Sequence, residues 1–383
     1  MSQPLELPRW IDLGVLPLLN ITLALAVSSL VLTWAGQDPA EVVRVLLRGA
    51  FGSRSGWSYT LYYTTTFIFT GLAVAVAFHG GLFNIGGEGQ AIMGGVGTAL
   101  AALAFADHLS AYLMLPLMVV GALGMGLLWA AVPAALQAWR GSHVVITTIM
   151  FNFIASAVLV YLLVDVLKEP GNMSPETKVF AASAHLPAAH DVLRAAGLDW
   201  PSTPLNVSLV LALVASVMVW ALVWRSHAGY GLRAVGFAPE AARYGGLSPR
   251  GHTLAALGIS GALAGLVGIN EIAGVHHRLL QDFTAGAGFA GIAVSLIGRN
   301  HPLGVVLAAL LFGALYQGGA ELAFEVPGFS RDMVFTLQGL VVLFAGALGH
   351  VAAPHLARWH AAWRSRRRTT STAPAPQNPQ RHG

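Results

Sequence analysis

The sequence contains no cysteine and few charged residues. The lack of cysteine excludes disulfide bonds and thiolate metal sites. Charged residues make up only 10% of the chain, whereas soluble domains carry roughly 25%. Lysine is confined to Lys168 and Lys178, and neither lies in the GxxxxGK[ST] pattern of a P-loop, so the chain has no site for ATP hydrolysis. The low fraction of charged residues, together with 55% hydrophobic residues and a mean hydropathy of +0.66, indicates an integral membrane protein.

Apolar runs account for most of the remaining sequence. Several exceed the ~18 residues that a spanning helix needs, and long alternating strands are lacking, so we predict an all-α membrane protein rather than a β-barrel. We expect about ten transmembrane helices within one transmembrane domain over 13–352. The predicted spans are 13–34, 58–79, 82–105, 111–134, 144–165, 205–224, 253–274, 286–299, 302–320 and 333–352.

Positive charge is distributed unevenly between the two sides of the predicted bundle. Most arginines fall on one side, in the N-terminal segment 1–12, the loop 226–252 and the basic tail 353–383, whereas the outer loop 166–204 lies on the other. The positive-inside rule therefore predicts that both termini are cytoplasmic. The composition of the C-terminal tail predicts that it is disordered. Segment 38–50 is typical of an amphipathic interfacial helix on the outer face. Because the arginines are dispersed, nucleic-acid binding is not expected.

Two glycine-interrupted segments occupy matching positions in the chain. Residues 286–299, "GAGFAGIAVSLIGR", would cover only ~21 Å as a helix, against a hydrocarbon core of ~30 Å. Residues 81–95, "GLFNIGGEGQAIMGG", have the same character. The two segments follow spans two and seven, and a separation of five spans inverts the second copy. We therefore predict two inverted, Gly-interrupted halves, whose broken segments lie near a transport site at the membrane midplane.

Polar side chains within the first broken segment are candidates for the substrate pathway. Asn84, Glu88 and Gln90 lie where unwound backbone would face a cavity, and an intramembrane carboxylate is costly unless it lines water or finds partners. One interpretation is structural: Glu88 caps the N-terminus of the next helix, and Asn84 closes the turn. The other is direct contact with a substrate. Both roles use the same residue types, so the sequence leaves them open.

Three further polar residues in the spans are weaker candidates for the same pathway. Asn152 could bind a ligand, although hydrogen bonding between helices is the commoner role of such a residue. Asn270 and Glu271 lie near the outer end of the seventh span, where an outer vestibule could solvate them instead. Gln317 and Gln338 are weaker candidates than these three residues.

Catalytic and metal sites are not indicated. His276 and His277 lack the spacing of a two-His-one-carboxylate site, so we expect them in an exposed loop. Neither HExxH nor GxSxG occurs, which argues against a membrane-embedded enzyme. We expect no catalytic residue, no metal and no cofactor.

The predicted cytoplasmic loop contains the sharpest local pattern, "GYGLRAVGFAPEAARYGGLSPRGH" at 229–252. Pro239 with Glu240 predicts the start of a short helix, and Gly245 with Gly246 predicts its end. A basic loop follows from the positive-inside rule alone, but that rule does not explain a compact helix between glycines.

At this loop the chain resembles a known family. "EAARYGG" is similar to the EAA-x3-G core of the coupling loop in permease subunits of ABC importers, although the isoleucine and Leu-Pro of the longer signature are missing. "GLFNIGGEGQ", "GSHVVITTIMFNFIA", "LRAVGFAPEAARYGGLS" and "GFAGIAVSLIGRNHPLGVVLAALLFGAL" resemble the nucleoside-type branch of the ribose/branched-chain amino-acid permease family. The resemblance runs from about residue 60 to 345.

This resemblance implies a multi-pass subunit of the bacterial inner membrane and a set of partners. The partners are a second, shorter permease in a heterodimer, a cytoplasmic ABC ATPase, and a periplasmic or lipid-anchored substrate-binding protein. It further implies that the coupling loop contacts the ATPase through Gly236, Pro239, Glu240, Ala241, Ala242 and Gly246.

The expected function is ATP-driven import of nucleosides, with this chain forming half of the translocation pathway. A neutral, hydroxyl-rich ligand suits the sparse Asn, Gln and Glu residues, because no fixed Lys or Arg is evident in the spans. The family also includes importers of simple sugars and riboflavin, which remain alternatives. A further alternative is a proton-coupled secondary transporter, in which Glu88 or Glu271 takes up and releases the proton.

Overall fold

The computed structural model describes residues 16–34 and 36–326, together with six positions between 333 and 343. The chain divides into two compact units, one of Met1–Pro39 with Phe335–Gly383 and the other of Ala40–Val334. The first unit holds helix α1 (Leu16–Trp34), and the second holds the helices after it. The predicted segments 1–12 and 353–383 lie outside the described residues, as does Gln338 and most of span 333–352.

The regular elements of the described residues are helices, as predicted, and strand pairing there is limited to two isolated bridges, Glu176 with Leu280 and Ala188 with Asn206. After α1 the elements are α2 (Pro39–Phe51), α3 (Arg54–His79), α4 (Gly87–Phe105), α5 (Ala111–Arg140), α6 (Val144–Tyr161), the π-helix η2 (Leu162–Val166), the 3-10 helix η3 (Ala182–Ala184), α7 (Ala189–Ala195), α8 (Ser208–Arg225), α9 (His227–Phe237), α10 (Pro239–Tyr244), α11 (Pro249–Gly265), the π-helix η4 (Ile269–His276), α12 (Ala287–Ile297) and α13 (Pro302–Glu325).

Six helices in the described part of the chain are long and apolar enough to cross a membrane. They are Arg54–His79, Ala111–Arg140, Val144–Val166, Ser208–Arg225, Pro249–His276 and Pro302–Glu325, and each overlaps a predicted span. The predicted spans 13–34 and 82–105 are the helices α1 and α4, which are not among the six. Span 286–299 is the 11-residue helix α12, as short as its sequence indicated.

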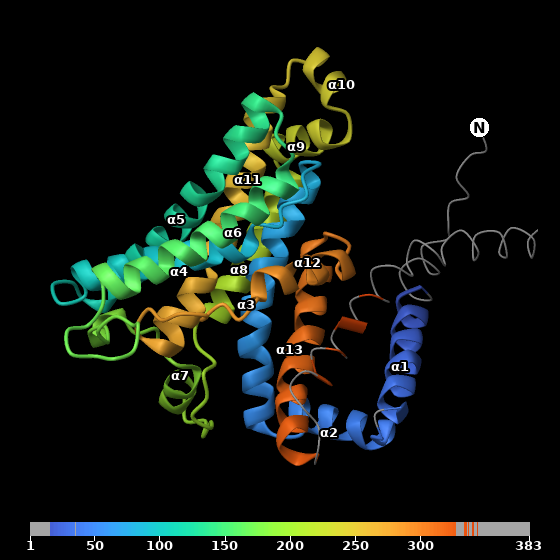
Figure 1. Cartoon of the computed structure of the whole chain (residues 1–383), viewed down its shortest axis with the longest axis vertical. Coiled ribbons are helices and arrows are strands. Elements are labelled where there is room, and N and C mark those ends of the chain that lie inside the picture. Colours follow the sequence, from blue (N-terminus) through green and yellow to red (C-terminus); the bar gives the residue numbers. More distant parts are fainter. Residues whose placement is uncertain are drawn as a thin grey trace, which may run out of the picture. The chain divides into compact units, whose positions relative to one another are not determined.

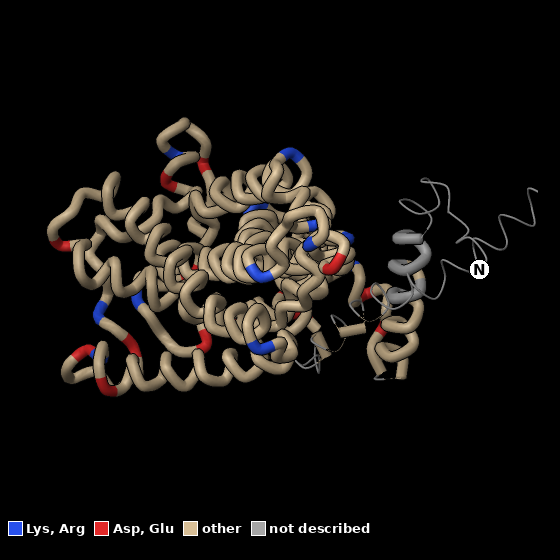
Figure 2. Tube along the Cα trace, turned by 90° about the horizontal axis from the view of Figure 1, so that it is seen from above, with Lys and Arg blue, Asp and Glu red and all other residues tan. Residues whose placement is uncertain are grey.

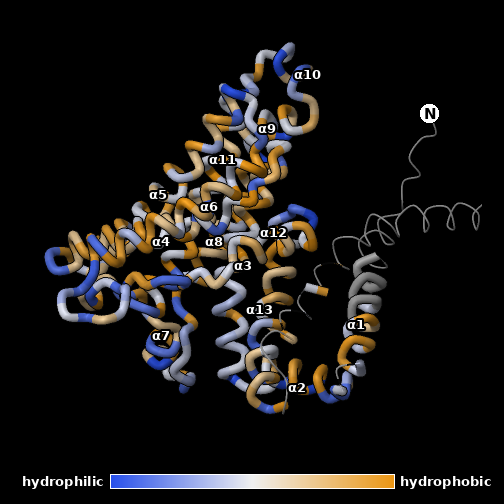
Figure 3. The backbone as a smooth tube through the Cα atoms, viewed as in Figure 1, coloured by the Kyte–Doolittle hydropathy of each residue, from blue (hydrophilic) through white to orange (hydrophobic). Residues whose placement is uncertain are grey.

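Helix α3 forms the buried centre of the second unit. It packs against α8, α11, α12 and α13, and 83% of its most apolar window is buried, compared with 22% for α5 and for α6. Figure 1 shows α3 alongside α13, and Figure 3 shows that much of α3 is paler, hence less hydrophobic, than α5. The exposed faces of α5, α6 and α8 carry mainly Leu, Val, Ile, Met and Phe, which suits contact with lipid. The polar side chains of α3 therefore face protein.

Close approach of α5 and α11 depends on small residues. A methyl group placed on Gly126 of α5 would overlap the backbone of Gly261 on α11, and the reverse holds as well. Small residues of this kind let transmembrane helices pack backbone to backbone. Lipid provides no hydrophobic driving force for helix association, so van der Waals contacts between the helices stabilise the packing instead.

The two ends of the second unit carry different features. Helix α10, next to α9, lies at the end opposite to α2 and α7 (Figure 1). Charged residues are sparse, and Figure 2 shows most of them in loops and at helix ends. The predicted coupling loop 226–252 and the predicted outer loop 166–204 thus occupy opposite ends, as a spanning bundle requires.

Candidate functional site

Asn84 closes the turn that separates α3 from α4. Gly81, just after α3, has a left-handed φ of 72°, and the chain then runs irregularly to the start of α4. The Asn84 side chain is fully buried, and its Oδ1 accepts a hydrogen bond from the Gly86 amide at 2.8 Å. Its Nδ2 donates to Gln90 Oε1 at 2.9 Å and to Ser260 Oγ on α11 at 2.8 Å. Asn84 and Gln90 are therefore engaged with the protein itself.

Asn152 of α6 satisfies the backbone on either side of the same break. Its Oδ1 accepts from the Gly89 amide at 2.8 Å, and its Nδ2 donates to the Ile85 carbonyl at 2.9 Å. The hydroxyl of Thr148, one turn earlier, accepts from the Ile85 amide at 3.3 Å. Unwound backbone must find partners inside a membrane protein, and α6 supplies them. The sequence favoured this role, hydrogen bonding between helices, over ligand binding for Asn152.

Glu88 joins the two broken segments. Its Oε1 accepts from Thr284 Oγ1 at 2.5 Å and from the Gly286 amide at 3.1 Å, and its Oε2 accepts from the Gly288 amide at 2.7 Å. The carboxylate thus caps the N-terminus of α12, whereas the structural interpretation of the sequence assigned it to the next helix, α4. That assignment is corrected by the structure, since the cap of α4 at Gly86 has no side-chain hydrogen bond.

The N-termini of α4 and α12 meet at this point. A methyl group on Gly288 would overlap the backbone of Glu88, so only glycine allows the two helix ends to come this close. Free amides and the helix dipoles make both N-termini electropositive, and the Glu88 carboxylate lies between them as the compensating charge. Glu88 is 9% exposed, so this compensation takes place largely away from water.

Asn270 and Glu271 lie in η4 and form a second buried cluster. Asn270 Nδ2 donates to Thr66 Oγ1 at 2.8 Å, and Asn270 Oδ1 accepts from Ser208 Oγ at 2.6 Å. Glu271 accepts from Thr66 Oγ1 at 2.6 Å and from the hydroxyl of Tyr62. The alternative of solvation by an outer vestibule is wrong, because the two residues are 1% and 6% exposed. The cluster ties η4 to α3 and to the start of α8.

Sequence reasoning missed the partners of these carboxylates and amides. Tyr62 and Thr66 come from the run "YYTTTFIFT", whose polar residues at helical spacing could have indicated a buried polar face on α3. Ser260 and Thr284 carry no comparable signal. Gln317, a weak candidate, donates to Glu321 within its own helix at 3.2 Å.

The predicted coupling loop contains the expected short helix. Helix α10 has Pro239 in its first turn, and the chain leaves it through Gly245 and a left-handed Gly246 with a φ of 84°. Ala242 is buried, whereas Glu240 and Ala241 are exposed. The sequence did not indicate that two aromatic residues, Phe237 just before α10 and Tyr244 at its end, are 94% and 93% exposed.

Gly236, at the end of α9, places this loop against the helix break. A methyl group on Gly236 would overlap the backbone of His79 through Gly81, and one on Gly81 would lie 2.6 Å from the Gly236 carbonyl oxygen. The loop and the turn before Asn84 are therefore in direct backbone contact.

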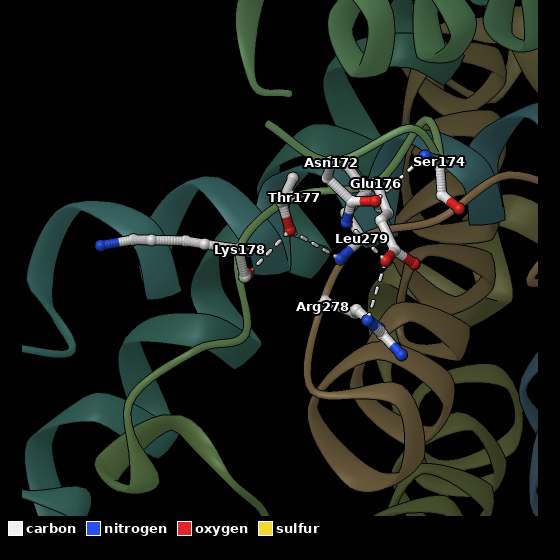
Figure 4. Close-up of polar contacts among 7 residues, drawn as sticks. All are labelled: Asn172, Ser174, Glu176, Thr177, Lys178, Arg278 and Leu279. Carbon is white, nitrogen blue, oxygen red and sulfur yellow. Dashed lines mark hydrogen bonds and ion pairs between the residues drawn. The ribbon is translucent and has the colours of Figure 1, made fainter. Parts of the chain in front are cut away.

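The outer loop is tied to the far end of η4. Figure 4 shows Glu176 and Arg278 pointing toward each other, with an ion pair at 2.9 Å, while Lys178 extends away from them. The Thr177 amide donates to the Leu279 carbonyl at 3.0 Å, and the Leu279 amide donates back to Thr177 Oγ1 at 3.0 Å.

The imidazole of His277 stacks on that of His185 in the same outer loop, with centroids 3.8 Å apart. His276 and His277 are partly buried at this junction, so the expectation of an exposed loop was wrong.

The sequence matches known transport proteins over most of its length. Residues 56–346 match the family described as "Branched-chain amino acid transport system / permease component". The guanosine ABC transporter permease protein NupP of Bacillus subtilis is 35% identical over 334 residues, which is 87% of this chain and 93% of the relative. The glucose ABC transporter permease protein TsgB13 of Haloferax volcanii is 33% identical, over 88% of each chain. The nucleoside ABC transporter permease protein NupB of Lactococcus lactis is 30% identical over 86% of this chain and 90% of the relative.

These matches agree with six candidate spans and with a chain that has no P-loop. The partners of such a component are an ATPase and a substrate-binding protein. The chain belongs to the family of branched-chain amino-acid-type transport permeases, and it is the multi-pass, non-catalytic permease component of an ABC importer.

Proposed function

We propose that this permease imports nucleosides. The observation that carries the proposal is its 35% identity to a guanosine permease over 87% of the chain, and NupB, a second relative, is named for nucleosides. The chemistry of the spans agrees with a neutral ligand, because the buried polar side chains of the described residues include no Lys or Arg. A strongly anionic substrate would need such a fixed cation.

Uptake measurements test the substrate. Labelled guanosine, uridine, ribose and glucose are offered to cells that express the complete complex, with an ATPase-inactive complex as the control for each. We expect ATP-dependent uptake of a nucleoside in preference to free sugars. The glucose permease among the relatives supports a competing candidate, and uptake of glucose without nucleosides would replace our proposal with a sugar importer.

We further propose that the chain forms half of the translocation pathway and pairs with a second permease. Two guanosine permease proteins of Bacillus subtilis, NupP and NupQ, both resemble this chain, which supports a heterodimer. The meeting of α4 and α12 at Glu88 supports two inverted halves of five spans each. With loop 226–252 in the cytoplasm, this arrangement of ten spans in the bacterial inner membrane has both termini inside.

The six pathway candidates act, in this proposal, by fixing the shape of the pathway wall. Their side-chain hydrogen bonds go to protein groups: Asn84, Gln90 and Asn152 hold the break, Glu88 holds α12, and Asn270 with Glu271 holds η4. Cysteine scanning of 82–92 tests this placement, because the chain has no cysteine of its own. Labelling by a water-soluble thiol reagent that changes between transport states is expected. Uniform protection in every state would place the pathway elsewhere.

The proton-coupled alternative fits the geometry less well. A proton carrier needs a carboxylate that alternates between partners or water, and both buried candidates are fully engaged. Glu88 accepts three hydrogen bonds, and Glu271 accepts from Tyr62, Thr66 and Asn270.

Helix α10 is proposed to dock the ATPase through Gly236, Pro239, Glu240, Ala241, Ala242 and Gly246, with Phe237 and Tyr244 as aromatic anchors. Aromatic side chains that are more than nine-tenths exposed beside a short helix are typical of an interface, where they supply most of the binding energy. Ala242 is buried and holds α10 in place, since its carbonyl accepts from the Leu247 amide at 3.0 Å.

Exposed positions give the cleanest test of docking. We expect Tyr244→Ala and Glu240→Arg to reduce ATPase binding and transport while leaving the thermal stability of the permease unchanged. Tyr112→Ala is the matched control, because Tyr112 is 91% exposed at the start of α5, away from the loop. Full ATP-dependent uptake by both variants would refute docking through α10.

A further inference from the structure

Two adjoining cavities lie beside the start of α11, and they differ in chemistry. The first, of about 370 Å³, is lined by Pro239, Glu240, Arg243, Leu247, Ser248, Pro249 and Arg250. The second, of about 180 Å³, is a crevice between the end of α8, α9 and α11, lined mainly by Leu222, Gly229, Leu232, Ala255 and Ile259. Ser248 lines both cavities, so a polar chamber adjoins an apolar crevice.

The crevice lies at the level where the membrane surface is expected. The guanidinium of Arg225, the last residue of α8, lies over the ring of Trp220 at 5.1 Å, and Trp220 is partly exposed. Trp rings and terminal Arg side chains gather at the membrane–water interface. Leu222, between them in sequence, lines the crevice. The crevice is therefore at the depth where acyl chains begin.

Small side chains keep the crevice open. Ala228, Gly251 and Ala255 are exposed along it, on α9 and α11, and the ring of His252 packs where Gly231 has no side chain. The polar chamber beside it carries two guanidinium groups and one carboxylate, that of Glu240. Within the described residues neither Arg243 nor Arg250 forms an ion pair or a side-chain hydrogen bond. The chamber thus has a net positive charge with nothing in the described part of the chain to neutralise it.

We propose that this groove binds an anionic phospholipid, with an acyl chain in the apolar crevice and the headgroup phosphate in the chamber lined by Arg243 and Arg250. An apolar slot at interfacial depth, adjoining a basic chamber on the water side, matches the acyl chain and the charged headgroup of such a lipid. Basic pockets on the cytoplasmic side of transmembrane helices bind lipid headgroups, and this chamber lies between α10 and the start of α11. The inference does not depend on which substrate is transported. It places a lipid against α10, the helix proposed to dock the ATPase.

Retention of lipid by the intact complex tests the site. The complex with its partner subunits is equilibrated in nanodiscs of phosphatidylglycerol and phosphatidylcholine in equal parts, extracted into detergent, and its bound lipids are counted by native mass spectrometry. We expect phosphatidylglycerol to be retained in preference to phosphatidylcholine. Arg250→Gln should lower its retention about five-fold, since one basic residue near an anionic headgroup contributes ~1 kcal/mol. Ala255→Phe should lower it as well, by filling the crevice.

Two matched variants serve as controls. Arg140→Gln removes an exposed positive charge at the end of α5, outside the groove, and Ala157→Phe adds the same bulk to the exposed face of α6. Both should retain the lipid as the unmodified complex does. Equal retention in all four variants would overturn the proposal. Complete displacement of the lipid by excess inorganic phosphate would also overturn the proposal, as would full retention by Ala255→Phe. Either result would show that the chamber binds phosphate without help from an acyl chain in the crevice.

Discussion

Replacing Glu88 by glutamine tests the joint between the two broken helices. All three hydrogen bonds to the carboxylate come from donors: the Thr284 hydroxyl and the amides of Gly286 and Gly288. Glutamine keeps one acceptor oxygen but presents an NH2 group where the second oxygen was. That NH2 group must face a donor, whichever way the side chain is turned.

The structure sets the size of the effect. If the glutamine side chain keeps its oxygen toward Thr284 and Gly286, the Gly288 amide loses its partner, and an unsatisfied buried donor costs about 1–3 kcal/mol. Loss of the negative charge at two helix N-termini adds about 0.3–1 kcal/mol for each helix. We therefore expect a total destabilisation of about 2–5 kcal/mol, larger than that of an exposed N-cap replacement.

Thermal unfolding of the purified permease in detergent, followed by tryptophan fluorescence, measures this loss. Glu321→Gln is the matched control, because Glu321 accepts a single, part-buried hydrogen bond from Gln317 of its own helix and should lose less than about 0.5 kcal/mol. Uptake per folded molecule separates capping from substrate contact: a capping role leaves it intact. An unchanged unfolding midpoint with abolished uptake would refute the capping geometry and make Glu88 a substrate ligand.

Individual contacts give three further predictions. Gly288→Ala should destabilise the permease by about 1–3 kcal/mol through overlap with the Glu88 backbone, whereas Gly124→Ala, with open space around it, should not, as thermal unfolding would show. Asn152→Leu should lower the free energy of unfolding by about 2–6 kcal/mol, because the Gly89 amide and the Ile85 carbonyl both lose their partner. Thr147→Val breaks hydrogen bonds only within α6 and should lower it far less in the same assay. Burial and the stacked His185 hold the pKa of His277 below its ordinary value of about 6.5. The neutral ring therefore stabilises the packing of the outer loop against His277 above that pH, and this stabilisation is lost as the pH falls through the lowered pKa of His277. Once exchange rates are corrected for the intrinsic pH dependence of amide exchange, the protection factors of residues 176–186 should therefore fall between about pH 7 and pH 5, an effect that His277→Gln abolishes and His108→Gln leaves unchanged.

Local signals in the sequence predicted local structure. The short helix α10 follows from Pro239 and the paired glycines, and the short α12 follows from an apolar run too brief to span a bilayer. The ends of α11 were less predictable, because the π-helix η4 continues the same apolar run without a change in composition.

Long-range partners could not be predicted from the same signals. Glu88 lies in the first turn of its own helix, yet its three donors lie about 200 positions away, on a segment whose register depends on the whole bundle. Solvation of Asn270 and Glu271 was left open as an alternative, because hydropathy gives depth along a span and not the direction that a side chain faces. Their burial depends on Tyr62 and Thr66, which α3 brings to them from the other half of the chain.

The described contacts form a short physical route from the proposed docking helix to the helix break. Helix α10 packs on α9, and Gly236 at the end of α9 meets Gly81 with no room for a methyl group between the two backbones. Three residues beyond Gly81, Asn84 holds Gln90, which lies within one turn of the Glu88 carboxylate that caps α12. Energetic coupling travels through packed, rigid elements of this kind. Because the contact is backbone against backbone, a change of rotamer cannot absorb a displacement of α9 toward the turn that carries Asn84.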